Sequence, residues 1–212
     1  MPMANSMTAA SRFVVLLGLG WMTISCSSCT TPAQVKANRP EMLSRAQWSA
    51  KPAGGSAKRH LPNRITIHHT ATLQKPDRSL EAKMQALQSF SQNPGTLGNG
   101  KPKPAWPDLP YHYYIDCHGG IAEGREVQFV GDTNTSYDPT GHVLVVLEGN
   151  FEEEQPTPEQ LNSLRLLLRW LVVSYHVSPD HIAGHKDSAD TLCPGKNLQG
   201  LLPELRQVAQ PR

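Results

Sequence analysis

The sequence predicts a mixed α/β fold, in which a central mixed β-sheet is flanked by helices. Residues 64–69 are rich in β-branched side chains, which is typical of a buried strand. Residues 142–147 give a second strong strand pattern. Residues 77–90 and 157–175 carry apolar side chains at helical spacing. Strands and helices mixed in this order favour helices packed on a mixed sheet.

Local patterns predict the remaining elements. The first helix has one apolar stripe, which consists of Leu80, Met84, Leu87 and Phe90. A long segment rich in glycine and proline predicts a loop, and loops of this kind often border a binding site. Two further strands are expected, the second with Gly124 inside it. The loop and the two strands cover residues 93–110, 111–116 and 121–130.

The second helix has a well-marked start. Thr157 can cap it, Pro158 suits the first helical position, and Gln160 can complete a capping box. Its apolar stripe consists of Leu161, Leu164, Leu168, Leu171 and Tyr175. Pro179 follows the predicted end.

Length and charge narrow the class of protein. The chain has 212 residues and a formal net charge of +2, which favours one compact domain with a real hydrophobic core. It contains no long basic block, so its charge does not indicate nucleic acid as a partner.

The first 25 residues have the pattern of a signal peptide. Arg12 precedes an apolar run from Phe13 to Ile24, and small residues follow. The run is short for a bilayer span, which needs about 20 apolar residues. Cys26 stands directly after the run and is a candidate site for a lipid anchor, although Thr23 occupies the place where lipoprotein sites usually carry leucine. We therefore expect export to the cell envelope, as a periplasmic, membrane-anchored lipoprotein; plain secretion and a short core helix are the alternatives.

The rest of the chain divides into a tether and one domain. Residues 26–40 are polar and contain two prolines, which predicts a linker. Residues 41–212 form the predicted domain. It contains Cys117 and Cys193, and a disulfide between them is one alternative in an oxidising compartment.

His185 and Cys193 are eight residues apart, in a polar segment that ends in Pro-Gly and is expected to be a loop. Imidazole nitrogen and thiolate sulfur both suit Zn²⁺. His68 or His69, at the end of the first strand, can supply a third ligand. Adjacent strand residues point to opposite faces, so only one of the pair should bind. Three protein ligands with one open position are typical of catalytic zinc; structural histidines and a buried thiol are the alternative.

Eight motifs occur along the domain, and together they are more specific than any one alone. They are Ser44–Ala50, Ile67–Ala71, Tyr111–Asp116, Glu123–Arg125, Leu147–Phe151, Thr157–Leu161 and the pair Gly184–Asp187 with Thr191–Gly195. In content and order they resemble the family of peptidoglycan recognition proteins and phage-lysozyme-type N-acetylmuramoyl-L-alanine amidases.

This resemblance implies a mixed sheet flanked by helices, with a zinc groove on one face. It places the zinc ligands at His68, His185 and Cys193, and catalytic side chains at Tyr111 and Thr191. The implied substrate is peptidoglycan or its muropeptide fragments, cut at the amide between the lactyl group of N-acetylmuramic acid and L-alanine. The intact ligand set favours an enzyme over a second hypothesis, a non-catalytic receptor for wall fragments.

The sequence departs from the family pattern in two places. Glu126–Val127 stands where the family often has Gly-Trp, so no stem-peptide preference can be carried over. Residues 131–141 lack the usual Val-Gly-x-His-Ala pattern, so one wall of the groove differs.

The sequence leaves the roles of several other polar residues open. Glu148 is a candidate general base. Arg125 can meet a peptide carboxylate or form a structural ion pair. His69 is expected to hydrogen-bond or pack behind the metal. Thr191 can support the transition state or stabilise its loop. A zinc hydrolase that acts on some other amide is a third hypothesis, and the lipoprotein-like leader argues against it.

Overall fold

The computed structural model describes residue 1, residues 37–97 and residues 100–210. The expected signal peptide, the lipid site at Cys26 and most of the tether lie outside these residues. No described helix is long and apolar enough to cross a membrane. The elements are β1 (Arg64–His69), α1 (Leu80–Gln92), β2 (Gly95–Thr96), β3 (Pro102–Lys103), β4 (Tyr113–Ile115), β5 (Ile121–Glu123), β6 (His142–Leu147), α2 (Pro158–Tyr175), β7 (Ile182–Gly184), α3 (Lys196–Gln199) and α4 (Leu202–Val208), with short 3₁₀ turns η1 (Pro179–His181) and η2 (His185–Asp187).

Five strands form the predicted mixed sheet, in the order β5-β4-β6-β1-β7. Strands β4, β6, β1 and β7 are parallel, and β5 is antiparallel to β4. The carboxyl ends of the four parallel strands therefore meet at one edge, where open α/β sheets commonly place their ligand sites. Strands β2 and β3 pair separately, inside the segment expected to be a loop.

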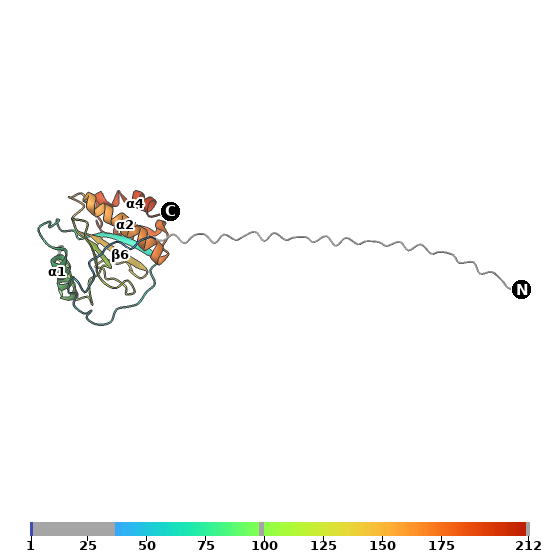
Figure 1. Cartoon of the computed structure of the whole chain (residues 1–212). Helices are drawn as coiled ribbons and strands as arrows, with labels where there is room; N and C mark the ends of the chain where they lie inside the picture. Colours follow the sequence, from blue (N-terminus) through green and yellow to red (C-terminus); the bar gives the residue numbers. More distant parts are fainter. Residues whose placement is uncertain (2–36, 98–99, 211–212) are drawn as a thin grey trace. The chain divides into compact units, whose positions relative to one another are not determined.

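Helices cover both faces of the sheet, as the sequence predicts. On one face, Ile65, Ile67 and Val145 belong to the larger hydrophobic core, together with residues of α2 and α4. On the other face, Val146 packs in a smaller core with Met84 of α1. Figure 1 shows α2 and α4 on one side of β6 and α1 on the other. The alternation of side chains along each strand assigns consecutive residues to different cores.

Helix α2 begins with the capping box that the sequence predicts. The Thr157 side chain accepts a hydrogen bond from the backbone N–H of Gln160, at 3.0 Å. The Gln160 side chain accepts one in return from the backbone N–H of Thr157, also at 3.0 Å. Pro158 occupies the first turn. Two backbone donors that have no partner within the helix are satisfied in this way.

Three predicted elements change their bounds in the structure. The strand predicted over residues 111–116 is shorter and forms β4, Tyr113–Ile115. Helix α1 begins at Leu80 rather than Asp77, because Ser79 caps it by accepting from the N–H of Ala82. The predicted strand over residues 121–130 is wrong beyond Glu123, where β5 ends. At the next residue, Gly124, the backbone turns toward the segment that precedes β4, and its N–H donates to the carbonyl of His112.

Candidate metal centre

Three side chains from distant parts of the chain converge at the carboxyl edge of the sheet. His68 is the penultimate residue of β1, His185 directly follows β7, and Cys193 lies in the loop beyond. Their candidate ligand atoms all lie within 4.8 Å of one another. His68 Nδ1 is 3.6 Å from Cys193 Sγ. Zn–N and Zn–S bonds in a tetrahedral site place such atoms roughly 3.5 Å apart, so this spacing suits zinc.

The strand geometry distinguishes His68 from His69. His68 faces Cys193 and His185, and its Nε2 is buried without a hydrogen-bond partner among the described residues. His69 points to the opposite face, where its Nδ1 accepts a hydrogen bond from the backbone N–H of Phe151 at 3.2 Å. His68 is therefore directed into the site, and His69 holds the end of the strand on the opposite face of the sheet.

The protonation states suit a metal site. Burial lowers the pKa of His68 well below its usual value, and burial lowers the pKa of His185 to about 4. Both rings are thus neutral at pH 7, which is the ligand form. Burial raises the pKa of Cys193 to about 12, so the thiol keeps its proton when no cation is near. A bound cation favours the thiolate, and metal binding should therefore release a proton.

Backbone contacts fold the loop from His185 to Cys193 back onto the sheet. The Lys186 N–H donates to the Cys193 carbonyl at 2.8 Å. The His69 N–H lies 3.4 Å from Cys193 Sγ. Thr191 Oγ1 accepts from the Cys193 N–H at 3.2 Å, so this hydroxyl has a loop-stabilising contact. The loop expected from its polar composition thus brings both ends to one place.

A cavity of about 770 Å³ opens at these three residues. Tyr111 and Thr191, the two candidate catalytic side chains, also line it. The ring centroids of Tyr111 and His68 are 5.2 Å apart. Burial, with the nearby Cys193 and Tyr137, raises the pKa of Tyr111, so its hydroxyl stays protonated and can donate a hydrogen bond.

The Glu123–Gly–Arg125 motif supports the segment that carries Tyr111. A Cβ on Gly124 would lie 2.3 Å from the Tyr111 carbonyl oxygen, so only glycine permits this approach. Arg125 is buried, donates to the carbonyl of Leu109 at 2.7 Å, and forms an ion pair with Asp132. Arg125 therefore acts as a structural residue here, which is one of its two expected roles.

The Glu148 carboxylate forms a buried ion pair with Lys83. It accepts from Lys83 Nζ at 2.8 Å and from the backbone N–H of Cys117 at 2.9 Å. Lys83 also pairs with Asp116 at 3.3 Å. Cys117 and Cys193 are both free thiols, so the structure contains no disulfide between them. These contacts tie α1 to the ends of β4 and β6.

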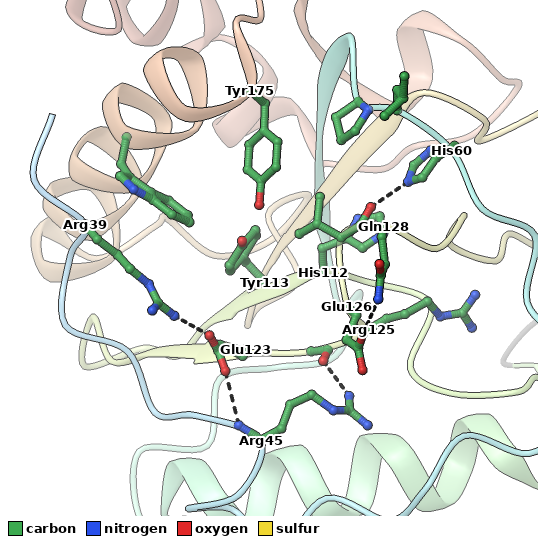
Figure 2. A pocket seen from close by; sticks show the side chains of 15 residues that line it. Arg39, Arg45, His60, His112, Tyr113, Glu123, Arg125, Glu126, Gln128 and Tyr175 are labelled. Carbon is green, nitrogen blue, oxygen red and sulfur yellow. Dashed lines mark hydrogen bonds and ion pairs between the residues drawn. The ribbon is translucent and has the colours of Figure 1, made fainter. Parts of the chain in front are cut away.

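A second cavity, of about 560 Å³, lies elsewhere on the domain and is lined by none of the three converging residues. Figure 2 shows the Arg39 side chain and the Arg45 backbone N–H directed at the Glu123 carboxylate, with Tyr113 and Tyr175 on another side. The Arg45 guanidinium donates instead to the Gly124 carbonyl. Glu126 and Val127, where the sequence departs from the family's Gly-Trp, line this second cavity rather than the metal cavity.

Two residues beside the centre have no recognisable sequence signal. Thr135 Oγ1 lies 2.8 Å from His185 Nε2, and the Tyr137 ring centroid is 5.0 Å from that of His185. Both belong to the segment of residues 131–141, of which Asp132 to Ser136 line the cavity. Thr135 and His185 are 50 positions apart in the chain, so only the fold reveals their contact.

Comparison with known proteins agrees with the predicted fold and family. Residues 58–196 match the family described as N-acetylmuramoyl-L-alanine amidase. The chain belongs to the N-acetylmuramoyl-L-alanine amidase family. Among relatives of this amidase family, peptidoglycan-recognition protein SD of Drosophila melanogaster is 29% identical over 171 residues, which cover 77% of this chain and 84% of that protein.

Two solved structures are similar in fold to this member of the amidase family. The endolysin N-acetylmuramoyl-L-alanine amidase LysCS from Clostridium intestinale has a TM-score of 0.62 and 26% identity, covering 80% of this chain and 98% of that one. Peptidoglycan recognition protein LE, in complex with tracheal cytotoxin, has a TM-score of 0.64 and 28% identity, covering 77% of this chain and 92% of that one. The amidase family thus includes relatives named as enzymes and relatives named as recognition proteins.

Proposed function

We propose that this protein is a zinc-dependent N-acetylmuramoyl-L-alanine amidase. It hydrolyses the amide between the lactyl group of N-acetylmuramic acid and L-alanine, in peptidoglycan or in its muropeptide fragments. The observation that carries this proposal is the convergence of His68, His185 and Cys193 at one cavity, with candidate ligand atoms within 4.8 Å of one another.

The donor set fits a catalytic zinc site, because two imidazoles and one thiolate leave the fourth tetrahedral position open. His68, His185 and Cys193 would hold the ion. Zinc held there would lower the pKa of a water to about 7 and polarise the amide carbonyl. Tyr111 keeps its proton and donates a hydrogen bond to the carbonyl oxygen as negative charge develops on it. Thr191 provides a weaker, secondary contact.

Relatives support the substrate class. The relative in complex with tracheal cytotoxin binds a monomeric peptidoglycan of the diaminopimelic acid type, and the endolysin relative is named as an amidase. A non-catalytic receptor that uses the same cavity is the second candidate, because other relatives are named as recognition proteins. The complete His–His–Cys set favours the enzyme, since a receptor needs no open metal position.

Envelope localisation is a separate part of the proposal. The apolar run that ends before Cys26 supports export followed by lipid attachment at that cysteine. Replacement of Cys26 by serine should abolish lipid labelling and release the protein from membranes. Equal membrane retention of this variant would refute the lipid anchor.

The decisive experiment treats purified muropeptides with the protein, with and without a chelator, and identifies the products by mass spectrometry. We expect free N-acetylmuramic acid ends and peptides with a free L-alanine amine, and no products after chelation. Cys193→Ser should abolish both zinc binding and turnover. Cys117→Ser is the matched control, because this second free thiol lies outside the converging set. Cleavage between sugars or within the peptide would refute the amidase proposal.

A further inference from the structure

The segment of residues 131–141 supplies a hydrogen bond to one of the candidate metal ligands. Thr135 Oγ1 lies 2.8 Å from His185 Nε2. The same hydroxyl lies 2.7 Å from Thr133 Oγ1. Thr133 Oγ1 also accepts a hydrogen bond from the backbone N–H of Thr135 at 3.1 Å. A short chain of polar groups therefore ends on one ring nitrogen of His185.

Hydrogen-bond valence is satisfied when the donors of this chain run from His185 toward Thr133, and this is the direction that leaves one ring nitrogen of His185 free for a metal. A hydroxyl oxygen has one proton to donate and two lone pairs. Thr133 Oγ1 uses one lone pair for the Thr135 N–H and has a second for the Thr135 hydroxyl. When Thr135 donates to Thr133, its own oxygen is left to accept from His185 Nε2–H. A neutral imidazole carries only one N–H, so His185 Nδ1 then keeps a free lone pair.

Neighbouring rings restrict the orientation of His185. Its ring centroid lies 4.6 Å from that of His68 and 5.0 Å from that of Tyr137. Tyr137 is in turn placed against His142, at 5.2 Å between centroids. These contacts oppose rotation of the His185 ring, so the hydrogen bond to Thr135 acts on a side chain that is already confined.

We propose that Thr135 is a positioning residue, which holds His185 as the Nε2-protonated tautomer and thereby makes Nδ1 the zinc ligand. This inference rests on the proposed zinc amidase function. Histidine ligands generally donate their second N–H to an acceptor, and loss of that acceptor typically lowers metal affinity about 10–100-fold.

Zinc affinity, measured by competition with a chromophoric chelator at one fixed pH, tests the proposal directly. Thr135→Val keeps the shape of the side chain but removes the hydroxyl, and should weaken zinc binding about 10–100-fold. Thr135→Ser restores the hydroxyl and should bind close to wild type. Thr140→Val is the matched control, because the Thr140 hydroxyl in the same segment contacts Lys58 and Asp138 rather than a metal ligand.

A spectroscopic measurement separates positioning from a general loss of structure. In the zinc-loaded wild type, ¹⁵N NMR of the His185 ring should show a proton on Nε2 and metal coordination at Nδ1. Thermal unfolding of the metal-free variants should match that of the wild type. Coordination through Nε2, or equal zinc affinity of wild type and Thr135→Val, would overturn the inference.

The same measurements distinguish this failure from failure of the proposed function. If the wild type binds no zinc, or binds zinc but releases no amidase products, the proposed function fails. If the wild type does both and Thr135→Val does so equally well, only the role of Thr135 is lost.

Discussion

Tyr111 is the side chain whose chemistry depends most on its surroundings. It lines the metal cavity beside His68, and its raised pKa keeps the phenol as a hydrogen-bond donor. Its backbone is fixed from behind by the close approach of Gly124. The Tyr111 hydroxyl is therefore held in a fixed position by the residues packed around its backbone. A donor that stabilises an oxyanion needs such a fixed position.

Replacing Tyr111 by phenylalanine deletes this hydroxyl and keeps the ring. Turnover of muropeptides should fall at least about tenfold, since a positioned proton-transfer or hydrogen-bonding group contributes about 10²–10⁴-fold. Zinc content and unfolding temperature should remain at wild-type values. Tyr175→Phe, at the second cavity, is the control and should leave turnover unchanged. Wild-type turnover in Tyr111→Phe would assign this tyrosine to packing alone.

Thr191→Val should cause a smaller loss of turnover than Tyr111→Phe, because the Thr191 hydroxyl already accepts a hydrogen bond from the Cys193 N–H within the loop.

At the scale of elements, the start of α2 links helix capping to the edge of the sheet where the site lies. Thr157 Oγ1 accepts from the Gln160 N–H and donates to the carbonyl of Cys117 at 2.9 Å. Gln160 in turn donates from its side chain to the carbonyl of Glu148 at 2.8 Å. One helix terminus therefore stabilises the residues that follow both β4 and β6.

Thr157→Ala should lower the free energy of unfolding by about 1 kcal/mol, the usual effect of losing an N-cap side chain. Urea-induced unfolding of the zinc-free protein measures this change without interference from metal. Thr157→Ser keeps the hydroxyl and should retain most of the stability. A Thr157→Ala variant as stable as the wild type would show that the capping box contributes nothing here.

At the scale of the whole molecule, several histidines are buried in neutral form. Burial lowers the pKa of His112 to about 3 and that of His142 to about 4. His112 Nδ1 accepts a hydrogen bond from the Leu144 N–H, a contact that protonation would remove. These histidines therefore stay neutral in the folded domain at pH values where they would be protonated in the unfolded chain, in which their pKa is near 6.5.

Stability of the zinc-free protein should therefore fall as the pH falls from about 6.5 to about 4. In this window the unfolded state binds more protons than the folded state, so the free energy of unfolding increases with pH. Each such histidine contributes a slope of at most about 1.4 kcal/mol per pH unit. Urea unfolding across this window, compared between wild type and His112→Gln, isolates one contribution. Identical slopes in the two proteins would contradict the prediction.

Much of the fold follows from patterns that are local in the sequence. The strand at residues 64–69, the strand at 142–147 and the capping box of α2 are all confirmed, because each depends on neighbours within a few positions. Local patterns predict the end of β5 wrongly. The strand-like sequence continues to Val130, but β5 ends at Glu123, because the backbone at Gly124 packs closely against the carbonyl of Tyr111.

The sequence by itself determined the mixed α/β class, the family and the three candidate ligands, because residue types and motif order are properties of the linear chain. Only the tertiary structure decided which contacts join them. His68 and Cys193 are 125 positions apart, and they meet because β1 lies between β6 and β7. Helix α1 brings Lys83 to Glu148, and the loop before β6 brings Thr135 to His185. Such contacts depend on strand order and loop path, and neither is encoded in a local periodicity.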